Sequence, residues 1–413
     1  MTIALIGSDI PALLPGLLAD MFYANKAEGC FRLHEPNPAL SELLKKYADA
    51  VIEKSGIQGQ FTVANTMEAA LEGADVVIFS DSLQNASRFQ MDLSALGGET
   101  REAAGLKNQA RLHDGIEGLL FTLRTGAKAN LLVNIMQKKC PHAIVLNLSE
   151  PLSQITALFQ LSGFSCYGFG EAPKIDGLCR LLNKSPSLVS FKSAGLYRFQ
   201  WLTKLQAGKD LLPEAARLYK KGAMGEEKTL YYSWYDALPI GEGHGESLPE
   251  NDAFTPDENP ELSESIKRRK ERLLRMNEVV THGLHTAHGQ LAQLALLQNV
   301  SSERPVQFLL KGSDYQGMVL KKNERAFSAL PYDALIQAKP ADTNFILPQG
   351  AIDITAEVAE GHLLSAKAAM GDRESLREYI ETAPALSGLD RLYLHSLIEQ
   401  MILLNGDVLP LYR

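Results

Sequence analysis

The sequence predicts an α/β protein in which a Rossmann-like, doubly wound parallel sheet is followed by an α+β, mostly helical region. Over the first 175 residues, short apolar runs alternate with segments of helical periodicity. This alternation is typical of βαβ units whose parallel sheet is covered on both faces. From about residue 176 onward, longer helical patterns dominate. We therefore expect two domains, over residues 1–175 and 176–413.

Composition narrows the class of protein. The chain has 413 residues, and its 41 Lys and Arg against 49 Asp and Glu give a formal net charge of −8. Its 45% of apolar and 22% of charged residues are ordinary for a globular protein and exclude collagen-like and broadly disordered chains. An acidic chain is a poor non-specific partner for nucleic acid or anionic membranes. We expect neither as a partner.

The cysteines and the hydropathy pattern indicate a compartment. The four cysteines form no CxxC pair and no zinc spacing, and free core thiols are their simplest interpretation. No apolar run reaches the roughly 18 residues of a membrane span, and the chain opens without a targeting pattern. We therefore expect a cytoplasmic protein.

The elements expected in the first domain follow one another as strand and helix, and the right-handed crossover rule then favours a doubly wound sheet. The expected strands span Thr2–Ile6, Phe31–His34, Phe61–Ala64, Ala74–Phe79, Ala143–Leu148 and Ser165–Phe169. The expected helices span Ile10–Tyr23, Pro38–Ser55, Met67–Glu72 and a long region through Asn130–Lys139.

The second domain is expected to be mainly helical. Its expected strands span Ser187–Ser193 and Arg304–Leu310, and its expected helices span Glu214–Lys221, Glu261–Leu297, Asp353–Ala369 and Ser387–Leu404. The segment Ile240–Pro260 is rich in glycine, proline and acidic residues, which is typical of an exposed loop. It is either a solvated insertion or a lid over a site.

The turn after the first strand is where the pyrophosphate of a dinucleotide would lie. Helix N-terminal amides attract the anion, and glycines allow the backbone to approach it. Here the turn reads Gly7-Ser8-Asp9, so only the first glycine of the fingerprint is present. A carboxylate at the second glycine position adds bulk and negative charge. These three residues are candidates for cofactor binding through an incomplete motif.

Three more polar residues follow predicted strands. Glu35 ends the second strand, where an acid can accept hydrogen bonds from ribose hydroxyls; the alternative is a solvated strand end. Ser80 and Asp81 follow the strand Ala74–Phe79, at the edge where open α/β sheets line their ligand crevice. Their alternative interpretation is ordinary loop polarity.

Several segments, in order, resemble one family, the NAD- and manganese-dependent glycosidases of glycoside hydrolase family 4. They are Ala74–Ser80 (ADVVIFS), Phe121–Thr125 (FTLRT), Val145–Pro151 (VLNLSEP), Gly168–Pro173 (GFGEAP), Ala194–Arg198 (AGLYR), Leu230–Tyr235 (LYYSWY), Ala369–Arg373 (AMGDR) and Leu397–Tyr412. The resemblance implies a dinucleotide-binding domain related to lactate and malate dehydrogenases, an α+β domain for substrate binding and self-association, and a homodimer or homotetramer.

The resemblance also implies an unusual reaction. In the family, NAD oxidises the C3 hydroxyl of the sugar, and the resulting ketone acidifies the C2 proton. A tyrosine removes that proton while a divalent metal such as manganese stabilises the enediolate, and the glycosidic bond then breaks by elimination. The route needs a hydride acceptor, a Lewis acid and a base.

The family's metal-binding motifs are altered in this chain. The position of the family's cysteine ligand is Gly170, followed by Glu171, and that of its histidine ligand is Arg198, preceded by Tyr197. Glycine has no side-chain ligand and arginine is a cation, so the resemblance implies that the usual metal site is absent. Cys166 lies four residues too early to replace the lost cysteine.

Glu171 and Arg198 lie on segments that converge on one metal in the family, so we hypothesise that they form an ion pair. In one version Arg198 acts as an electrophile, since a guanidinium can bind a carboxylate or an enolate-like oxygen bidentately. In the other, the pair is a structural salt bridge in a dead site. Tyr197 is a candidate substrate-binding residue.

Other family positions suggest further site residues. Glu150 replaces the asparagine of the family's Asn-Pro segment, and Asn147 is retained; both are candidates to bind sugar hydroxyls. Glu150 can instead cap the helix after Pro151. Tyr231 maps to the tyrosine chosen as the base, although tyrosine and tryptophan clusters usually pack.

A run of histidines offers a weak candidate for a replacement metal site. His282, His285 and His288 are spaced three apart, and two of them, His282 and His285, could share one helix face. The alternative is a set of polar histidines at the surface or the edge of the core. Thus no metal is expected with the usual ligands.

Taken together, these features predict a divergent family 4-like glycosidase that acts on a sugar or sugar acid through NAD-dependent oxidation and elimination, with the usual metal site lost. One alternative is a metal-free NAD-dependent oxidoreductase of a sugar-like substrate, and another is a non-catalytic metabolite-binding homologue. Asp9, Gly170 and Arg198 favour the non-catalytic homologue. The retained chain length and the polar residues Glu35, Asn147 and Tyr231 argue against it. The sequence shows no basic pocket that would demand a phosphorylated sugar.

Overall fold

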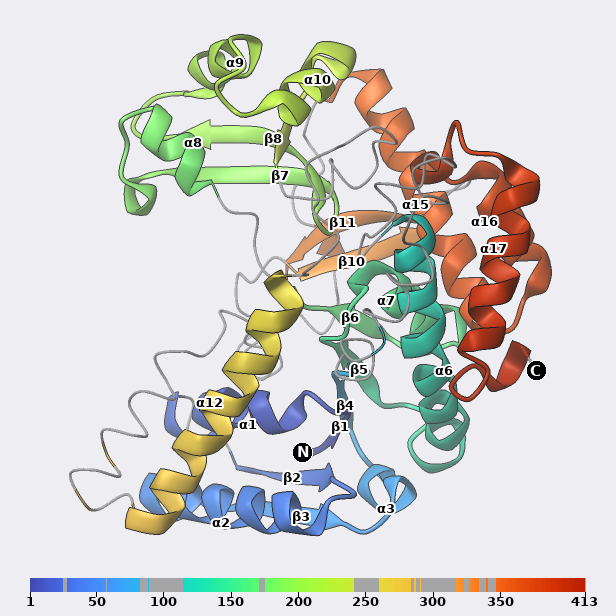
Figure 1. Ribbon diagram of the computed structural model, residues 1–413. Coiled ribbons are helices and arrows are strands. Elements are labelled where there is room, and N and C mark those ends of the chain that lie inside the picture. Colours follow the sequence, from blue (N-terminus) through green and yellow to red (C-terminus); the bar gives the residue numbers. More distant parts are fainter. Residues whose placement is uncertain are drawn as a thin grey trace.

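The core of the computed structural model is one large twisted sheet with helices on both faces (Figure 1). The structure describes residues 1–24, 28–56, 58–81, 88, 114–170, 175–240, 260–283, 286, 290, 317–322, 327–333, 339–340 and 347–412. The strand order of the sheet is β12-β11-β10-β6-β5-β4-β1-β2-β3. Six parallel strands thus run in the order 3-2-1-4-5-6, which is the order of doubly wound dinucleotide-binding sheets. The predicted fold class is confirmed.

The parallel strands lie where the sequence predicts them. They are β1 (Thr2–Ile6), β2 (Gly29–His34), β3 (Gly59–Ala64), β4 (Val76–Phe79), β5 (Ile144–Asn147) and β6 (Cys166–Gly168). β1 lies between β2 and β4, with Leu5 opposite both Leu33 and Ile78. Alternate residues of β1 enter two different cores, because successive side chains point to opposite faces. Burial on both faces explains why these strands read as continuous apolar runs.

Helices of the first half cover both faces of this sheet. They are α1 (Ile10–Leu18), which continues as a π-helical turn (Ala19–Ala24), α2 (Pro38–Ser55), α3 (Met67–Leu71), α6 (Gly115–Lys139) and α7 (Leu152–Leu161). The bounds of α2 agree with the predicted ones for a local reason. Asn37 Oδ1 accepts hydrogen bonds from the N–H groups of Ala39 and Leu40, and Gly56, at φ 67°, ends the helix.

Residues after 175 form a second sheet and also extend the first. The second sheet is antiparallel, in the order β7 (Ser190–Leu196), β8 (Phe199–Gln206) and β9 (Leu238–Ile240). Around it lie α8 (Asp176–Leu181), a 3-10 turn (Pro186–Leu188), α9 (Leu212–Lys220) and α10 (Glu226–Tyr235). The large sheet is extended by the antiparallel strands β10 (Gly317–Lys322), β11 (Phe327–Asp333) and β12 (Lys339–Pro340). The division into domains at residue 175 therefore stays a prediction.

Two long helices and a C-terminal group complete the fold. α12 (Pro260–His282) crosses α1 and α2, while α15 (Gln349–Ala369) packs on α6 and α7 (Figure 1). The remaining elements are α16 (Arg373–Thr382), a 3-10 turn (Pro384–Leu386), α17 (Arg391–Leu404) and a last 3-10 turn (Pro410–Tyr412). The predicted strand Arg304–Leu310 and the inner part of the predicted loop Ile240–Pro260 lie outside the described residues. Among the described helices, none is long and apolar enough to cross a membrane.

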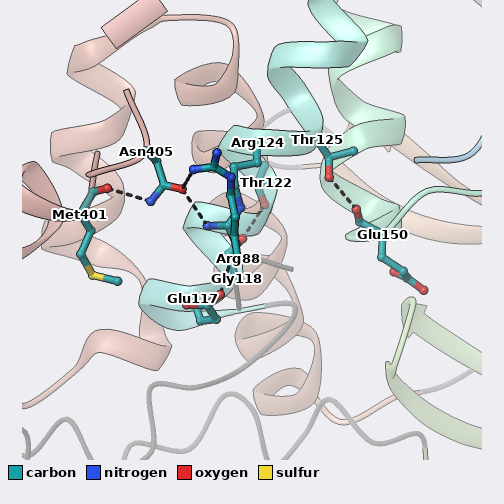
Figure 2. A network of polar contacts seen from close by, with 9 residues as sticks. All are labelled: Arg88, Glu117, Gly118, Thr122, Arg124, Thr125, Glu150, Met401 and Asn405. Atoms are coloured by element: carbon teal, nitrogen blue, oxygen red, sulfur yellow. Dashed lines mark hydrogen bonds and ion pairs between the residues drawn. The ribbon is translucent and has the colours of Figure 1, made fainter. Parts of the chain in front are cut away.

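A buried polar network, built on an ion pair within α6, joins this helix to the C-terminal segment (Figure 2). Arg124 Nη2 lies 3.3 Å from Glu117 Oε1, and the exposed fractions of these side chains are 1% and 0%. Asn405 Oδ1 accepts hydrogen bonds from Arg124 at 3.5 Å and from Arg88 at 3.3 Å. Arg88 also pairs with Asp407. A buried charge is tolerated only when it is paired and hydrogen-bonded, so this network holds the end of α17 at a fixed place against α6.

Candidate functional site

Four of the predicted residues meet at the carboxyl edge of the large sheet, in the turns that follow β1 and β4. Ser80 Oγ donates to Asp9 Oδ2 at 3.2 Å, and Ser8 Oγ donates to Asp81 Oδ1 at 3.1 Å. The backbone N–H of Asp9 also donates to the carbonyl of Ser80 at 3.1 Å. Each turn therefore supplies a hydroxyl donor to the carboxylate of the other, and the two turns act as one unit.

Gly7 makes this close approach possible. It has a φ of 122°, which side chains rarely adopt, and a Cβ at this position would lie 2.0 Å from the carbonyl oxygen of Ser80. The first glycine of the fingerprint is thus required by the contact between the turns after β1 and β4. This requirement holds whether or not a nucleotide is bound.

Lys128, which the sequence did not single out, completes this edge. Its Nζ, on α6, donates to Asp81 Oδ1 at 2.6 Å, and the exposed side-chain fractions of Lys128 and Asp81 are 35% and 12%. The N–H of Asp81 donates to Ser149 Oγ at 2.8 Å, which ties the edge to the turn after β5. A single lysine within a helix carries no local signal of such a contact, because the contact depends on how α6 packs on the sheet.

The start of α1 offers few amides to a diphosphate. The N–H of Asp9 is bonded to Ser80, and those of Ile10 and Ala12 are bonded to the carbonyls of Gly7 and Asp9 at 3.3 and 2.9 Å. Pro11 has no N–H. The usual anion site at a helix N-terminus therefore keeps its dipole but lacks most of its hydrogen-bond donors. The residues present fit the close backbone approach of a dinucleotide, but its diphosphate needs positive charge from elsewhere.

Glu35 lies at the place predicted for it, directly after β2 at the same edge. Its Oε1 accepts a hydrogen bond from the N–H of Asn37 at 2.9 Å, and its side chain is only half-buried. A carboxylate fixed at this point fits an acceptor of ribose hydroxyls. Its part in nucleotide binding stays a prediction.

The side-chain amide of Asn147, at the end of β5, is buried and hydrogen-bonded within the protein. Its side chain is buried, Oδ1 accepts from the N–H of Ser149, and Nδ2 donates to Thr156 Oγ1 at 3.0 Å and to the carbonyl of Leu152 at 3.2 Å. These bonds shape the turn between β5 and α7. A direct contact of Asn147 with a sugar stays a prediction.

Glu150 precedes a cis peptide bond to Pro151 and lies at the start of α7. Its Oε2 accepts a hydrogen bond from the N–H of Leu152 at 3.0 Å, and its carbonyl accepts one from Thr125 Oγ1 at 3.2 Å (Figure 2). The first of these bonds is the helix cap weighed above for this residue. Binding of sugar hydroxyls by Glu150 stays a prediction.

The two segments that the resemblance aligns with the family's metal-binding motifs lie against each other. A Cβ at Gly170 would lie 2.3 Å from Cε2 and 2.6 Å from Cζ of Tyr197, so the tyrosine ring rests on the Cα of the glycine. Gly170 follows β6 in the large sheet, and Tyr197 lies at the tip of the hairpin between β7 and β8. A side chain cannot stand at residue 170 while the Tyr197 ring keeps this position.

Arg198 shares the two-residue tip of that hairpin. It is half-buried and has a φ of 65°. For a residue with a side chain, this left-handed conformation costs about 1 kcal/mol. A strained residue at a site is a reason to look for a function, here the electrophile predicted for Arg198. Glu171, its proposed partner, lies outside the described residues.

Tyr231, the predicted base, lies on α10 in an aromatic cluster. It is 2% exposed, and its ring centroid lies between 5.7 and 6.1 Å from those of Phe199, Trp201, Trp234 and Tyr235. These contacts have the edge-on and tilted geometry of packed aromatic side chains. The geometry is that of the packing alternative, and a role as base stays a prediction.

Where the structure describes the candidate metal ligands, they form no cluster. Within the described parts of the chain, no three His, Cys, Asp or Glu side chains are placed to hold a metal ion. Cys166 is buried in β6, where complete burial raises the pKa of its thiol well above the ordinary value. His282 is the exposed last residue of α12, and His285 lies outside the described residues. The described residues at this place do not fit the family's metal.

A comparison with protein families finds a match in the first part of the chain. Residues 3–165 match the model of the family 4 glycosyl hydrolases. The match covers less than half of the 413 residues, so it shows that the first part of the chain is similar to this family. The resemblance inferred from the ordered motifs is thereby confirmed. No curated protein sequence matches the chain.

Solved structures of two 6-phospho-glucosidases share its fold over the whole length. A 6-phospho-α-glucosidase from gut microorganisms, in complex with NAD and Mn²⁺, is 15% identical with a TM-score of 0.74, covering 98% of each chain. The 6-phospho-β-glucosidase of Thermotoga maritima, with manganese, NAD⁺ and glucose-6-phosphate, is 15% identical with a TM-score of 0.72, covering 99% of each chain. At 15% sequence identity, the similarity to these structures shows a shared fold.

The contact between Gly170 and Tyr197 predicts a strong coupling in a double-mutant cycle. Gly170→Ala should lower the free energy of unfolding by about 2 kcal/mol, because the added methyl group must displace the tyrosine ring. In a Tyr197→Ala background the same substitution should cost less, because only Leu152 Cδ2, at 2.9 Å from the added Cβ, then has to move. Urea denaturation of the four proteins measures the cycle.

Gly177→Ala, on α8, is the matched control. A Cβ there meets no atom within 4 Å and the backbone is helical, so the substitution should be neutral or slightly stabilising. Equal costs of Gly170→Ala with and without the Tyr197 ring would show that the two residues are not in contact.

Proposed function

We propose that this chain is an NAD-dependent enzyme of a sugar or sugar phosphate that works without the metal ion of its family 4 relatives. The observation that carries the proposal is the contact of the Tyr197 ring with Gly170, which fills the place of a metal-ligating side chain. The full-length likeness to NAD-bound 6-phospho-glucosidases supports the nucleotide and substrate class. At the carboxyl edge of the large sheet, Gly7 and Glu35 also support binding of the nucleotide.

NAD is the cofactor that these residues fit. Gly7 permits close backbone approach, and Glu35 is placed to accept hydrogen bonds from ribose hydroxyls. Bound NAD would supply a hydride acceptor for a sugar hydroxyl. Lys128 neutralises Asp81, which leaves less negative charge beside a diphosphate.

Arg198 is the residue that we propose takes over electrostatic stabilisation. The guanidinium is always protonated and presents a planar set of N–H donors. It can therefore stabilise negative charge that develops on a ketone or enolate-like oxygen without a change of its own charge. Its strained backbone at the hairpin tip, beside the ring of Tyr197, supports a functional placement.

The leading function is glycosidase activity by oxidation and elimination, with Arg198 as the electrophile and Tyr231 as the candidate base. A second function, oxidation of a sugar hydroxyl without bond cleavage, is favoured by one observation. Tyr231 is 2% exposed and packed among aromatic rings, so a proton-accepting role for its hydroxyl would require a path to the substrate. Oxidation alone requires no base at C2. A cytoplasmic location and self-association also belong to the proposal.

Binding of the cofactor is testable by thermal melting of the full-length protein. NAD should raise the melting midpoint by a few degrees at concentrations far above its Kd, because a ligand that binds only the folded state stabilises it. Mn²⁺ should add nothing, alone or with NAD. Sodium sulfate at equal ionic strength controls for general anion effects. A midpoint that NAD leaves unchanged would contradict the cofactor assignment.

Activity on 4-nitrophenyl glucosides, with and without a 6-phosphate, separates the two functions. A glycosidase should release nitrophenol without accumulating NADH, because hydrolysis leaves the oxidation level of the sugar unchanged. An oxidoreductase should accumulate NADH without nitrophenol. Arg198→Met should slow the active reaction by about a hundredfold, the usual cost of one lost donor to a developing oxyanion, while the NAD-induced shift persists. Activity that requires Mn²⁺ would refute the metal-free proposal.

A further inference from the structure

α12 is unusually basic for this chain. Six of the nine residues from Lys267 to Arg275 are lysine or arginine, although the formal net charge of the chain is −8. The helix crosses α1 and α2, as Figure 1 shows in yellow. A basic helix therefore lies beside the part of the sheet where a dinucleotide is expected.

The way α12 packs determines which of its lysine and arginine side chains face α1. Leu273, Met276 and Val279 belong to the apolar core shared with α1 and α2. Arg269 and Arg272 continue this stripe toward the start of the helix, at the spacing of three and four residues that keeps side chains on one face. Lys267, Lys270 and Arg275, by contrast, are exposed.

The two arginines reach different points of α1. Arg269 Nη1 donates to the carbonyl of Ser8, in the turn between β1 and α1. Arg272 Nη1 donates to the carbonyl of Ala12 at 3.0 Å, within the helix. Arg269 thus places a half-buried guanidinium on the residue before Asp9, at the point where a diphosphate would approach the turn.

The turn between β1 and α1 carries a negative charge and few free N–H donors, so a cationic side chain there would favour binding of a diphosphate. The carboxylate of Asp9 stands at the second glycine position, and the N–H groups at the start of α1 are bonded within the chain or missing at Pro11. Lys128 is engaged with Asp81. A diphosphate adds further negative charge, so a cation near the turn favours its binding by offsetting both the diphosphate and Asp9.

We propose that Arg269 is the diphosphate-binding residue of this protein, so that α12 completes a nucleotide site that the incomplete glycine motif leaves short of donors. The proposal rests on the proposed binding of NAD. The planar fork of an arginine suits phosphate oxygens because it donates two parallel hydrogen bonds. The second half of the chain then takes part in binding the nucleotide, and not only the substrate.

Calorimetric titration of the full-length protein with NAD, ADP and adenosine tests this role. Arg269→Gln should raise the Kd for NAD and for ADP about tenfold or more, the usual worth of a charge-assisted hydrogen bond. The Kd for adenosine, which has no phosphate, should stay unchanged. Arg272→Gln is the matched control, because it removes an arginine of the same helix that contacts α1 away from the turn. It should change all three Kd values less than threefold.

Arg269→Lys keeps the proposal testable if the glutamine variant does not fold. Lysine retains the charge but not the fork, so it should weaken binding of NAD and ADP less than glutamine does. Equal weakening of ADP and adenosine, or equal effects of Arg269→Gln and Arg272→Gln, would overturn the role of Arg269 while NAD binding stands. A wild-type protein that binds neither NAD nor ADP would overturn this role and the proposed function together.

Discussion

The contact of the Tyr197 ring with the Cα of Gly170 determines the geometry of the candidate site. It brings the tip of the β7–β8 hairpin onto the end of β6, so it joins the small sheet to the large one at the site. Only glycine leaves room for the ring, and the ring occupies the space of any side chain at residue 170. A side chain at residue 170 and this position of the tyrosine ring therefore exclude each other. Arg198, next to the ring, brings a fixed positive charge to the same place.

At the carboxyl edge of the large sheet, hydrogen bonds within the chain occupy groups that could otherwise bind a ligand. The turns after β1 and β4 hold each other through Gly7, two serine hydroxyls and two carboxylates, which uses groups that a dinucleotide fold normally leaves for its ligand. Positive charge comes instead from side chains of distant elements, Lys128 on α6 and Arg269 on α12. We propose one principle for both ends of the site: arginine or lysine side chains stand where the resemblance to family 4 implies a metal, or where a dinucleotide fold offers free backbone amides.

Local patterns made most of the first half predictable. The bounds of β1 and α2 follow from an apolar run and from a cap and a C-terminal glycine, which are signals within a few neighbouring residues. The meeting of Ser8, Asp9, Ser80 and Asp81 follows from the topology, since parallel strands end at one edge. Lys128 and Arg269 were not predictable in this way, because their contacts depend on the rotation of α6 and α12 against the sheet. The basic run of α12 was the available signal for Arg269. Glu171 and His285, which the sequence also named, lie outside the described residues.

Titration with Mn²⁺ in the presence of NAD and glucose-6-phosphate shows directly whether the protein binds a metal ion at this site. The electron paramagnetic resonance signal of free Mn²⁺ loses amplitude when the ion binds to a protein, so titration of the loaded protein counts the bound ions. We expect the signal to keep its full amplitude, because the described residues around Gly170 and Arg198 provide no metal site. A saturable loss of one Mn²⁺ per chain would contradict it.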